Sequence, residues 1–495
     1  MILGGTSMNK GDKKGDSDIT PPSASYVDFR DAIGGTPLMG AAFKGKVQLV
    51  KSLIERGADP SLMDNRGWNS LHFAANGGDA DIIDLIHTQV PNIESKTGDG
   101  CTPLMIAAVN SKLHAVRWFL EKGATVTRED NSGANALHFA AEGGDTDIID
   151  LIHTHLLNIE SKTSQGRTPL MMAARGGKLQ AVKWFLEKGA TVNCDDNNGR
   201  NTLHFAAEGG DTDIIDLIHT HLLNIELKTG EGHTPLMVAA GSGNLQAVNW
   251  FLEKGATVPC EDNRGWNTLH IATSSGDTDI IDLIHTHLPN VDSKTNEGYT
   301  PLMVAAFKGK LPVVKWFLEK GATVTLKDKA GWNMLHFAAQ GGDTDILDLI
   351  HNHVPNIESR SLAGITPLMV AVGNCKLHAV QWFIEKGASV ACVDENGCNI
   401  LHFAAKNCDP DVIHRILTYV PDIESKTAFG ETPLIIAVRH GKLQSVKYLL
   451  ERGANPLAKD NNGWGSLYHA SSQDADFLNL LQSHVANSES TTGND

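Results

Sequence analysis

Residues 166–174 read Gly-Arg-Thr-Pro-Leu-Met-Met-Ala-Ala, and the Thr-Pro-Leu triplet in this stretch returns at a fixed period along the chain. Seven triplets begin 66 residues apart, at Thr36, Thr102, Thr168, Thr234, Thr300, Thr366 and Thr432. Self-similarity at a fixed period is typical of tandem repeat proteins, in which each unit packs against its neighbours only. The spacing therefore predicts an array of repeats rather than a set of unrelated domains.

A second signature, Asn-x-Leu-His-Phe-Ala-Ala with small variations, lies midway between the triplets. Its leucines are Leu71, Leu137, Leu203, Leu269, Leu335 and Leu401, with a degenerate copy at Leu467. Because Leu38 and Leu71 are 33 residues apart, the unit has 33 residues and two alternating types. We call the Thr-Pro-Leu unit the first type and the Leu-His-Phe unit the second type. The pattern predicts about fourteen repeats in one continuous array over residues 31–485.

The two ends of the chain have a different composition. Residues 1–30 are rich in Gly, Ser, Asp, Lys and Pro, and residues 486–495 are similar, so we expect a disordered leader and a disordered tail. Met1-Ile2-Leu3 is too short an apolar run for a signal peptide, and no stretch approaches the roughly 18 apolar residues of a membrane span. We therefore expect no membrane insertion.

Charge and cysteine content restrict the partners and the compartment. A formal net charge of −16 argues against nucleic acid as a partner, because a surface that follows phosphates needs a basic stripe. The seven cysteines are odd in number and lack paired short spacings, which predicts neither a disulfide framework nor a Cys-x-x-Cys metal site. A reducing compartment, the cytoplasm or alternatively the nucleus, is the expected location.

Each unit is predicted to form two short helices and an extended finger. Pro103 is suited to the first turn of a helix, and small apolar residues follow it at helical spacing. A broader apolar stripe over residues 113–120 predicts the second helix, which ends at Gly123. The polar, turn-rich residues 125–133 predict a protruding hairpin.

These motifs resemble the ankyrin repeat. One part of that pattern is matched by Gly166-Arg167-Thr168-Pro169-Leu170 with Ala173-Ala174 and Gly189-Ala190, and another by Leu203-His204-Phe205-Ala206-Ala207. Second-type repeats depart from it, with Leu156-Leu157 where the pattern has Gly-Ala. The resemblance implies an all-α fold of L-shaped helix pairs and hairpin fingers, stacked into a curved solenoid whose fingers and first helices line a concave binding face. It also implies that His204 and His336 hydrogen-bond neighbouring backbone.

One column at the start of the second helices alternates in charge, as in Lys46, Asp79, Lys112, Asp145, Lys178 and Asp211. We infer a ladder of ion pairs between repeats, each worth about 0–1 kcal/mol. The alternative is that Asp145 and its equivalents cap the second helix.

Motifs that suggest chemistry recur in almost every second-type repeat. Asp145 and Asp147 resemble a metal-binding pair, but many equivalent catalytic centres along one array are implausible. His153 and His155 are separated by about 200° around a helix and are not placed to chelate together. We therefore expect no enzymatic activity, no cofactor and no metal site.

Recognition is expected where near-identical repeats differ at exposed positions, since the core columns must stay similar to pack. The finger column immediately before each first helix contributes Arg167, Arg200, His233, Trp266, Tyr299, Trp332 and Ile365. The column that closes the first helix contributes Phe43, Arg175, Phe307, Lys308 and Arg439. Two alternatives stay open: the tryptophans pack on the adjacent finger, and the cations are only solvated.

The sequence thus predicts a monomeric, non-catalytic scaffold that binds a protein partner on its concave face and finger tips. One alternative is a substrate-receptor adaptor in ubiquitin ligase or signalling complexes. A second alternative is a membrane-skeleton linker.

Overall fold

The computed structural model describes residues 27–471, 473 and 475–491. Over these residues the regular elements are the helices α1 to α28, and extended pairing is limited to two isolated bridges, Glu261 with Asn267 and Lys459 with Gly465. The described part of the chain is therefore an all-α solenoid of fourteen helix pairs, as predicted.

Odd-numbered helices are the first helices of the repeats: α1 (Pro37–Phe43), α3 (Ser70–Gly77), α5 (Pro103–Val109), α7 (Ala136–Gly143), α9 (Pro169–Arg175), α11 (Thr202–Gly209), α13 (Pro235–Ser242), α15 (Thr268–Ser275), α17 (Pro301–Phe307), α19 (Met334–Gly341), α21 (Pro367–Gly373), α23 (Ile400–Asn407), α25 (Pro433–Arg439) and α27 (Ser466–Ala470). Even-numbered helices are the second helices: α2 (Val47–Glu55), α4 (Ala80–His87), α6 (Leu113–Glu121), α8 (Thr146–His153), α10 (Leu179–Glu187), α12 (Thr212–His221), α14 (Leu245–Glu253), α16 (Thr278–His287), α18 (Leu311–Glu319), α20 (Thr344–His351), α22 (Leu377–Glu385), α24 (Pro410–Leu417), α26 (Leu443–Glu451) and α28 (Ala475–Thr491).

The chain divides into two compact units. Unit 1 ends at Gly209 but includes residues 216–222, and unit 2 contains residues 210–215 together with the described residues from Leu223 onward. The predicted continuous array is thus divided near its middle, within the helix pair of α11 and α12.

Both repeat types start their first helix with a reciprocal cap. Thr300 Oγ1 accepts from the Met303 N–H at 3.3 Å, and Met303 Sδ accepts from the Thr300 N–H at 3.4 Å. Asn333 Oδ1 accepts from the His336 N–H at 3.3 Å, and His336 Nδ1 accepts from the Asn333 N–H at 3.2 Å. A cap of this kind is worth about 1 kcal/mol, which helps to explain why helices of only seven or eight residues form.

The same histidines connect neighbouring repeats. His336 Nε2 lies 3.0 Å from the Ile365 carbonyl, 29 residues further along, and His270 Nε2 lies at the same distance from the Tyr299 carbonyl. Burial lowers the pKa of His336 to about 4, so the ring is neutral and its Nε2–H donates to the carbonyl. This confirms the expected bracing role for His336. For His204, Nδ1 accepts from the Asn201 N–H at 3.2 Å.

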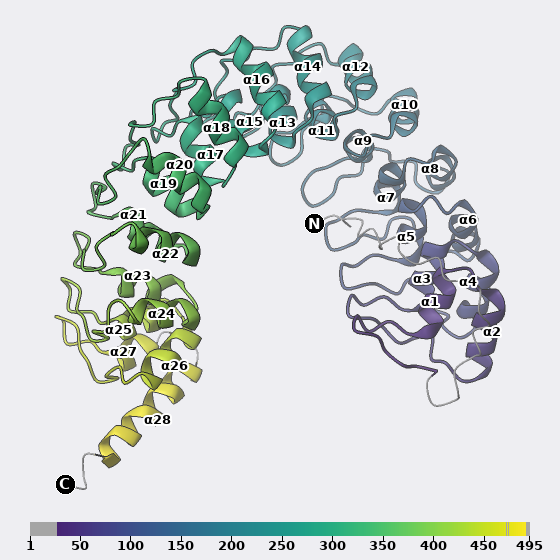
Figure 1. Ribbon diagram of the computed structural model, residues 1–495. Helices are drawn as coiled ribbons and strands as arrows, with labels where there is room; N and C mark the ends of the chain where they lie inside the picture. The colour runs from purple at the N-terminus through teal and green to yellow at the C-terminus, as the bar shows by residue number, and fades with distance from the viewer. Residues whose placement is uncertain (1–26, 472, 474, 492–495) are drawn as a thin grey trace, which may run out of the picture. The chain divides into compact units, whose positions relative to one another are not determined.

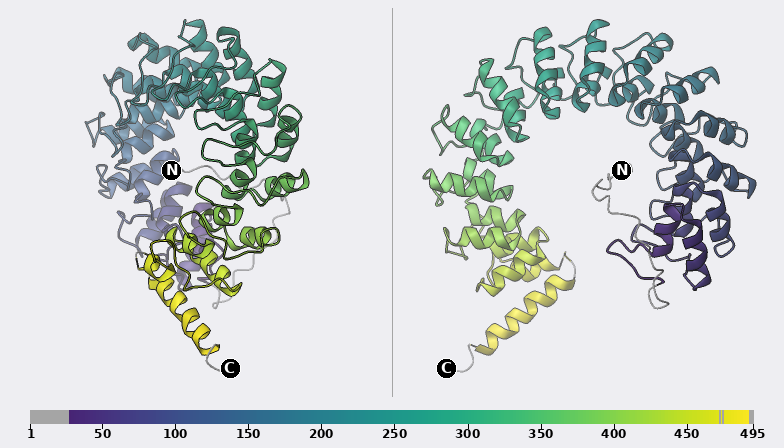
Figure 2. Two further views of the ribbon diagram at one scale, coloured as in Figure 1. Left: turned by 90° about the vertical axis from the view of Figure 1, so that its left-hand side faces the viewer. Right: turned by 45° about the vertical axis from the view of Figure 1, so that its right-hand side comes forward.

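Stacking of the two helix rows forms the core. In unit 1, Figure 1 shows the first helices α1, α3, α5, α7 and α9 in one row and α2, α4, α6, α8 and α10 in a second row, and Figure 2 shows the helix pairs of both units in further views. The second helices supply fully buried rings such as Phe119, Phe185, Phe251, Phe317 and Phe383. Each ring contributes about 1.5–3 kcal/mol on burial.

The predicted ion-pair ladder at the start of the second helices is wrong. In the described residues Asp145 caps α8, because its Oδ1 accepts from the Asp147 and Ile148 N–H groups at 3.0 and 3.2 Å. Lys178 instead lays its aliphatic stem across Gly144, where an added Cβ would lie 2.6 Å from Lys178 Cδ. The charge alternates along this column because the second-type repeats have an aspartate that caps the second helix. The first-type repeats have a lysine whose side chain packs against a glycine of the preceding repeat.

Ion pairs between repeats occur elsewhere, at the second helices. Trp382 Nε1 donates to Asp348 Oδ1 at 2.9 Å, Lys386 Nζ lies 3.1 Å from the same oxygen, and the His351 ring packs edge-on against Trp382. The arrangement recurs with Asp84, Trp118 and Lys122, with Asp150, Trp184 and Lys188, and with Asp282, Trp316 and Lys320. These groups of Trp, Asp and Lys side chains lie on the surface formed by the second helices.

Both predicted ends of the array need adjustment where the structure describes them. Val27 is buried, and Asp28 Oδ1 accepts from the Asp59 N–H at 3.1 Å, so residues 27–30 are not a disordered leader. Helix α28 continues to Thr491, so the predicted tail at 486–495 begins inside a helix. Residues 1–26 and 492–495 lie outside the described part.

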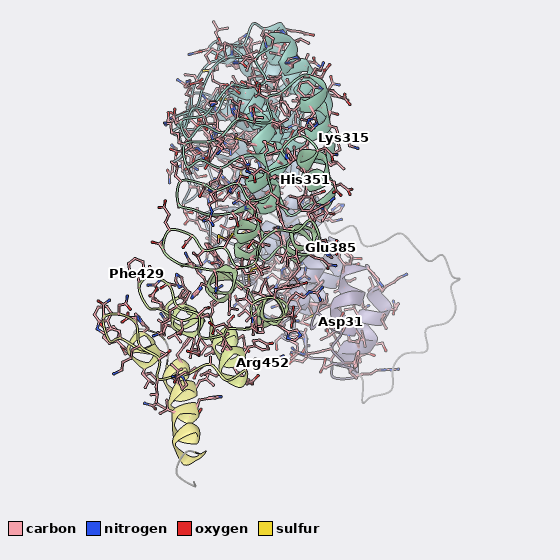
Figure 3. The ribbon with its side chains drawn as sticks, turned by 60° about the vertical axis from the view of Figure 1, so that its left-hand side comes forward. Asp31, Lys315, His351, Glu385, Phe429 and Arg452 are labelled. Atoms are coloured by element: carbon pink, nitrogen blue, oxygen red, sulfur yellow. A yellow bond between two sulfur atoms is a disulfide. The ribbon has the colours of Figure 1, made fainter. Side chains whose placement is uncertain are left out.

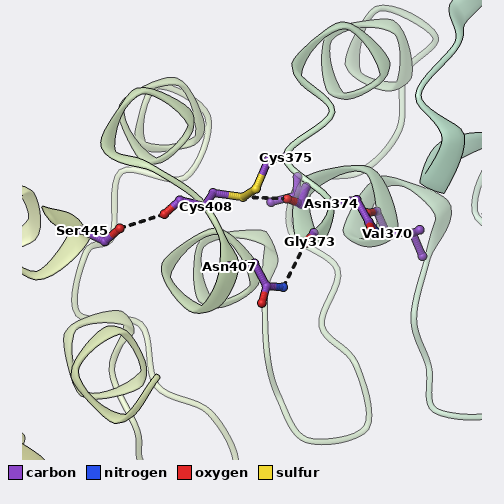
Figure 4. Close-up of a disulfide and its surroundings, with 8 residues drawn as sticks. Val370, Gly373, Asn374, Cys375, Asn407, Cys408 and Ser445 are labelled. Atoms are coloured by element: carbon purple, nitrogen blue, oxygen red, sulfur yellow. Dashed lines mark hydrogen bonds between the residues drawn. A yellow bond between two sulfur atoms is a disulfide. The ribbon is translucent and has the colours of Figure 1, made fainter. Parts of the chain in front are cut away.

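Two cysteines form a disulfide that the sequence analysis did not expect. Cys375 and Cys408 are 33 residues apart, and their Cα atoms are separated by 5.6 Å (Figure 4). Both replace glycines at the junction between the first and second helices, and Cys375 keeps the left-handed backbone of that position, with φ of 57°. The absence of short spacings misled the prediction, because stacking places residues one repeat apart side by side.

Candidate functional site

Predicted finger residues lie where a hairpin finger meets the start of a first helix, and their backbone is held from two sides. The Tyr299 N–H donates to Thr295 Oγ1 at 3.1 Å, and its carbonyl accepts from His270. Arg167 is held in the same way, with His138 Nε2 3.1 Å from its carbonyl. The buried histidines therefore position the candidate residues of the next finger.

We call the surface formed by the fingers and the first helices the finger face, and the surface formed by the second helices the outer face. In unit 2, Figure 3 shows Phe429 on a finger at one side of the ribbon, and Lys315, His351 and Glu385 on the second helices at the other side. The twelve residues predicted for recognition belong to the finger column and the first-helix ends, and thus to the finger face.

Finger residues gather in pairs around one ring in two second-type repeats. The fourth residue of the first helix is Phe205 in α11 and Phe337 in α19, and it contacts the finger residues 38 and 5 positions before it. We call each of these phenylalanines a ring platform. Two fingers from adjacent repeats therefore combine their side chains over a single platform.

The Phe205 platform, in unit 1, carries arginines. The guanidinium carbons of Arg167 and Arg200 lie 5.6 and 4.4 Å from the ring centroid. Arg175 Nε lies 2.8 Å from Glu208 Oε1, and Arg200 pairs with the other oxygen of the same carboxylate. Arg167 and Arg200 thus share the ring, and Arg175 and Arg200 share the glutamate.

Electrostatics at this platform reflect the crowding of cations. Burial raises the pKa of Glu208, but the hydrogen bond and charge of Arg200 and the charge of Arg175 outweigh it, so the pKa lies below its usual range. Burial, followed by repulsion from Arg175 and Arg200, lowers the pKa of Arg167. The local field therefore favours an additional anion.

The Phe337 platform, in unit 2, carries aromatic rings. The rings of Tyr299 and Trp332 lie 5.5 and 5.6 Å from the Phe337 ring in edge-on geometry, and all three residues belong to unit 2. Trp332 also lies 5.6 Å from His336, so it packs on the first helix of its own repeat rather than on an adjacent finger. Both finger rings remain half-buried, which leaves aromatic surface open.

Three other predicted finger residues of unit 2 lie apart from these groups. Trp266 packs 5.7 Å from the His270 ring. His233 Nε2 lies 3.2 Å from Asp262 Oδ2. Ile365 is half-buried and accepts the hydrogen bond from His336 through its carbonyl.

Predicted residues at the ends of the first helices are also dispersed. Phe43 and Phe307 are exposed by 45% and 39%, and Lys308 Nζ lies 5.2 Å above the Phe307 ring. Arg439 Nη1 pairs with the buried Glu431 at 2.5 Å. The twelve residues are therefore not one site, and the structure groups Arg167 with Arg175 and Arg200, and Tyr299 with Trp332.

The finger face also has a pocket of about 420 Å³ near the C-terminal end that the sequence analysis missed. Its wall includes Cys398, Lys406, Glu431, Arg439 and Trp464. Only Arg439 was among the predicted residues, although Cys398, Glu431 and Trp464 occupy the predicted finger column. The finger column also varies at these three positions, but its candidate residues were taken only from the middle of the array.

The described residues contain neither a metal-binding cluster nor a membrane-spanning helix. No group of three or more His, Cys, Asp or Glu side chains in that part of the chain is arranged to hold a metal ion. No helix among the described residues combines the length and the apolar character needed to cross a bilayer.

The repeat geometry and the capping signatures agree with a match to the family model for ankyrin repeats. That model matches residues 24–89, 38–130, 71–163, 126–196, 170–262, 236–328, 335–427 and 401–492. The chain belongs to the ankyrin-repeat family. Ankyrin repeats are in general non-catalytic modules of protein–protein interaction, which is the coarse function that membership supports.

Similar proteins share repeats but little of their length. An ankyrin repeat protein of Acanthamoeba polyphaga mimivirus is 26% identical over 153 residues, which cover 30% of this chain and 20% of that protein. The human transient receptor potential cation channel subfamily A member 1 and the mouse ankyrin and armadillo repeat-containing protein are each 29% identical over 133 residues, or 26% of this chain. Those segments cover 12% and 9% of the two proteins.

Proposed function

We propose that this ankyrin-repeat chain is a non-catalytic scaffold that binds a protein partner along its finger face, the face that the family resemblance predicts to be concave. The observation that carries the proposal is the open aromatic surface at the Phe337 platform. Tyr299 and Trp332 are held on Phe337 yet remain half-buried, and Tyr and Trp are among the residue types enriched in binding hot spots.

The outer face supports the choice by contrast. Trp316 and Trp382 are each engaged by an aspartate, a histidine and a lysine of the array, so much of their hydrogen-bonding and ring surface is used within the fold. Tryptophan occurs on both faces, but the finger column changes from Arg to His, Trp, Tyr and Ile between repeats, whereas the outer-face column keeps tryptophan, as Trp118, Trp184, Trp250, Trp316 and Trp382. Variation at positions that stacking does not fix is the expected mark of recognition.

The two alternatives share this surface and differ in what else they require. A substrate-receptor adaptor of a ubiquitin ligase or signalling complex needs a second, effector-binding surface. A membrane-skeleton linker needs one partner at each end of the array. We propose that the scaffold acts as a monomer, and the net charge of −16 supports protein rather than nucleic acid as its partner.

A comparative pull-down tests the proposal. The bait is the full chain, compared with a variant carrying Trp266→Ala, Tyr299→Ala and Trp332→Ala, and recovered proteins are quantified by mass spectrometry. We expect the specific partners of the wild type to be lost, because each deleted hot-spot ring costs about 2 kcal/mol or more of binding free energy.

A matched control removes tryptophans from the other face. The Trp184→Ala and Trp316→Ala double variant deletes the same residue type from the second helices, and circular dichroism confirms that both variants remain helical. Equal partner recovery by the finger-face variant, or selective loss by the outer-face variant, would refute the proposed surface.

A further inference from the structure

We propose that the Phe205 platform is a carboxylate-binding subsite of the finger face that takes an aspartate or glutamate side chain of the bound protein. The inference rests on the proposed function and specifies the chemistry of one part of the partner. It concerns unit 1 alone, since Arg167, Arg175, Arg200 and Glu208 all belong to that unit.

Unused donor capacity is the first support. The guanidinium of Arg167 makes no hydrogen bond to the described residues, and its Nε is buried without a partner. Its nearest carboxylate oxygen, Asp196 Oδ2, is 3.9 Å away, beyond hydrogen-bond distance. Arg200 Nε is likewise buried without a partner, although the terminal nitrogen of Arg200 is paired with Glu208.

Glu208 is committed to other donors, whereas Asp196 keeps one buried oxygen, Oδ2, without a hydrogen bond. Glu208 divides its two oxygens between Arg175 and Arg200. Asp196 uses Oδ1 to accept from the N–H groups of Asn198 and Arg200, each at 2.9 Å, which fixes the finger turn. Three guanidinium groups therefore share two carboxylates, and the group without a hydrogen bond is that of Arg167.

Preorganisation is the second support. The Phe205 ring, which is fully buried, carries Arg167 and Arg200, and the Arg167 backbone is braced by His138. The Arg167 side chain is 23% exposed, so its terminal nitrogens retain access to solvent. A planar guanidinium fixed on a ring is suited to bidentate pairing with a carboxylate, and such charge-assisted pairs are about twice as strong as neutral hydrogen bonds.

The array contains an internal comparison at Arg66. This guanidinium lies 5.9 Å from the ring of Phe73, the α3 residue equivalent to Phe205, but its Nε and Nη2 donate to Asp64 Oδ2 at 3.0 and 2.8 Å. Asp64 thus gives Arg66 the carboxylate hydrogen bonds that Arg167 lacks. The comparison shows which geometry a satisfied platform arginine adopts in this fold.

Selection from random peptides displayed on phage tests the inference with the full chain as bait. We expect the selected peptides to be enriched in Asp and Glu. Measured by fluorescence anisotropy, Arg167→Gln is expected to weaken their binding about tenfold or more, the loss of roughly 1.4 kcal/mol for one charge-assisted pair. Arg167→Lys, which keeps the charge but not the fork, should fall in between, and Arg66→Gln should bind as the wild type does.

Other outcomes overturn the inference in distinguishable ways. Selected peptides without acidic enrichment, or unchanged binding to Arg167→Gln with an unchanged circular dichroism spectrum, would refute the subsite. If the same peptides lose binding to Trp332→Ala, the scaffold function stands while the subsite fails. Recovery of no binding peptide would also count against the subsite, and the pull-down would then decide the scaffold function separately.

Discussion

Acid should weaken the array through its buried histidine braces, and His336 is the position where this is most clearly testable. The perturbation is His336→Met, which is the exchange that the first-type repeats already contain at the equivalent position, as in Met303. Methionine sulfur accepts the capping N–H, as Met303 Sδ does from Thr300 at 3.4 Å, but it has no donor for the Ile365 carbonyl. The variant therefore keeps the cap and loses the brace.

The size of the change in stability follows from the difference in proton binding between the folded and unfolded chains. Burial lowers the pKa of His336 from 6.5 to about 4 in the folded protein, so the unfolded chain binds more protons once the pH falls below 6.5. Stability from the neutral ring is present above pH 6.5 and is lost progressively as the pH falls through that value towards 4. With these two pKa values, the loss between pH 7 and pH 5 is about 2 kcal/mol for this one histidine.

At pH 7, the variant should be less stable than the wild type by about 1 kcal/mol, the usual net value of one hydrogen bond. At pH 5, the wild type loses about 2 kcal/mol that the variant does not, so the order of stabilities should reverse. Urea unfolding of the full chain at the two pH values, followed by circular dichroism, measures the change in the difference between the two proteins.

A matched control is His353→Met, since His353 is exposed in the turn after α20 and does not connect neighbouring repeats as His336 does. It should show no such reversal. A difference between wild type and His336→Met that stays constant from pH 7 to pH 5 would show that the ring is not held neutral by burial, and the reasoning would be wrong.

Three further predictions concern local features of the fold. Cys375→Ser should lower the free energy of unfolding by about 3–4 kcal/mol, the chain-entropy value for a loop of one repeat, and should abolish the sensitivity of urea unfolding to added thiol. Gly133→Ala should destabilise more than Gly123→Ala in thermal unfolding, because both backbones are left-handed but only at Gly133 would the new Cβ lie 2.7 Å from Ser164 N. Asp343→Ala should cost about 1 kcal/mol in the same assay, since it removes the cap of α20.

The fold could be predicted almost completely from the sequence because each of the fourteen helix pairs must stack on its neighbours. Stacking favours a capping threonine or asparagine and a small apolar face in almost every unit, so the same signal occurs many times along the sequence. The chain ends lie outside the repeat pattern, so no second copy supports a prediction there. The predictions at the ends were the least accurate, as Val27 and the continuation of α28 show.

The column that alternates in charge shows where pattern alone fails. Lys178 and Asp145 are one repeat apart and opposite in sign, which is the pattern of an ion pair. Local geometry decides otherwise, because a carboxylate at a helix start finds two backbone N–H groups within its own chain segment, whereas a surface ion pair is worth little. A strong local partner outcompetes a weak distant one.

The disulfide was missed for the opposite reason, since the relevant distance lies between repeats. Cys375 and Cys408 occupy the same position in consecutive units, a position that is otherwise glycine in most of the array. A reading of the sequence by columns, rather than by spacings along the chain, would have placed the two thiols side by side.

The same distinction explains why a list of candidate residues in chain order does not show how the structure groups them. In chain order, each finger residue is assumed to be related equally to the finger before it and to the finger after it. The platform belongs only to second-type repeats, so the fingers act in pairs: Arg167 with Arg200 over Phe205, and Tyr299 with Trp332 over Phe337. If the finger face binds a partner as proposed, we expect recognition by the 66-residue pair rather than by the 33-residue repeat. The bound partner would then meet a different chemistry at each platform, and exchanging the two finger residues of one pair should change its preference there without disturbing the stack.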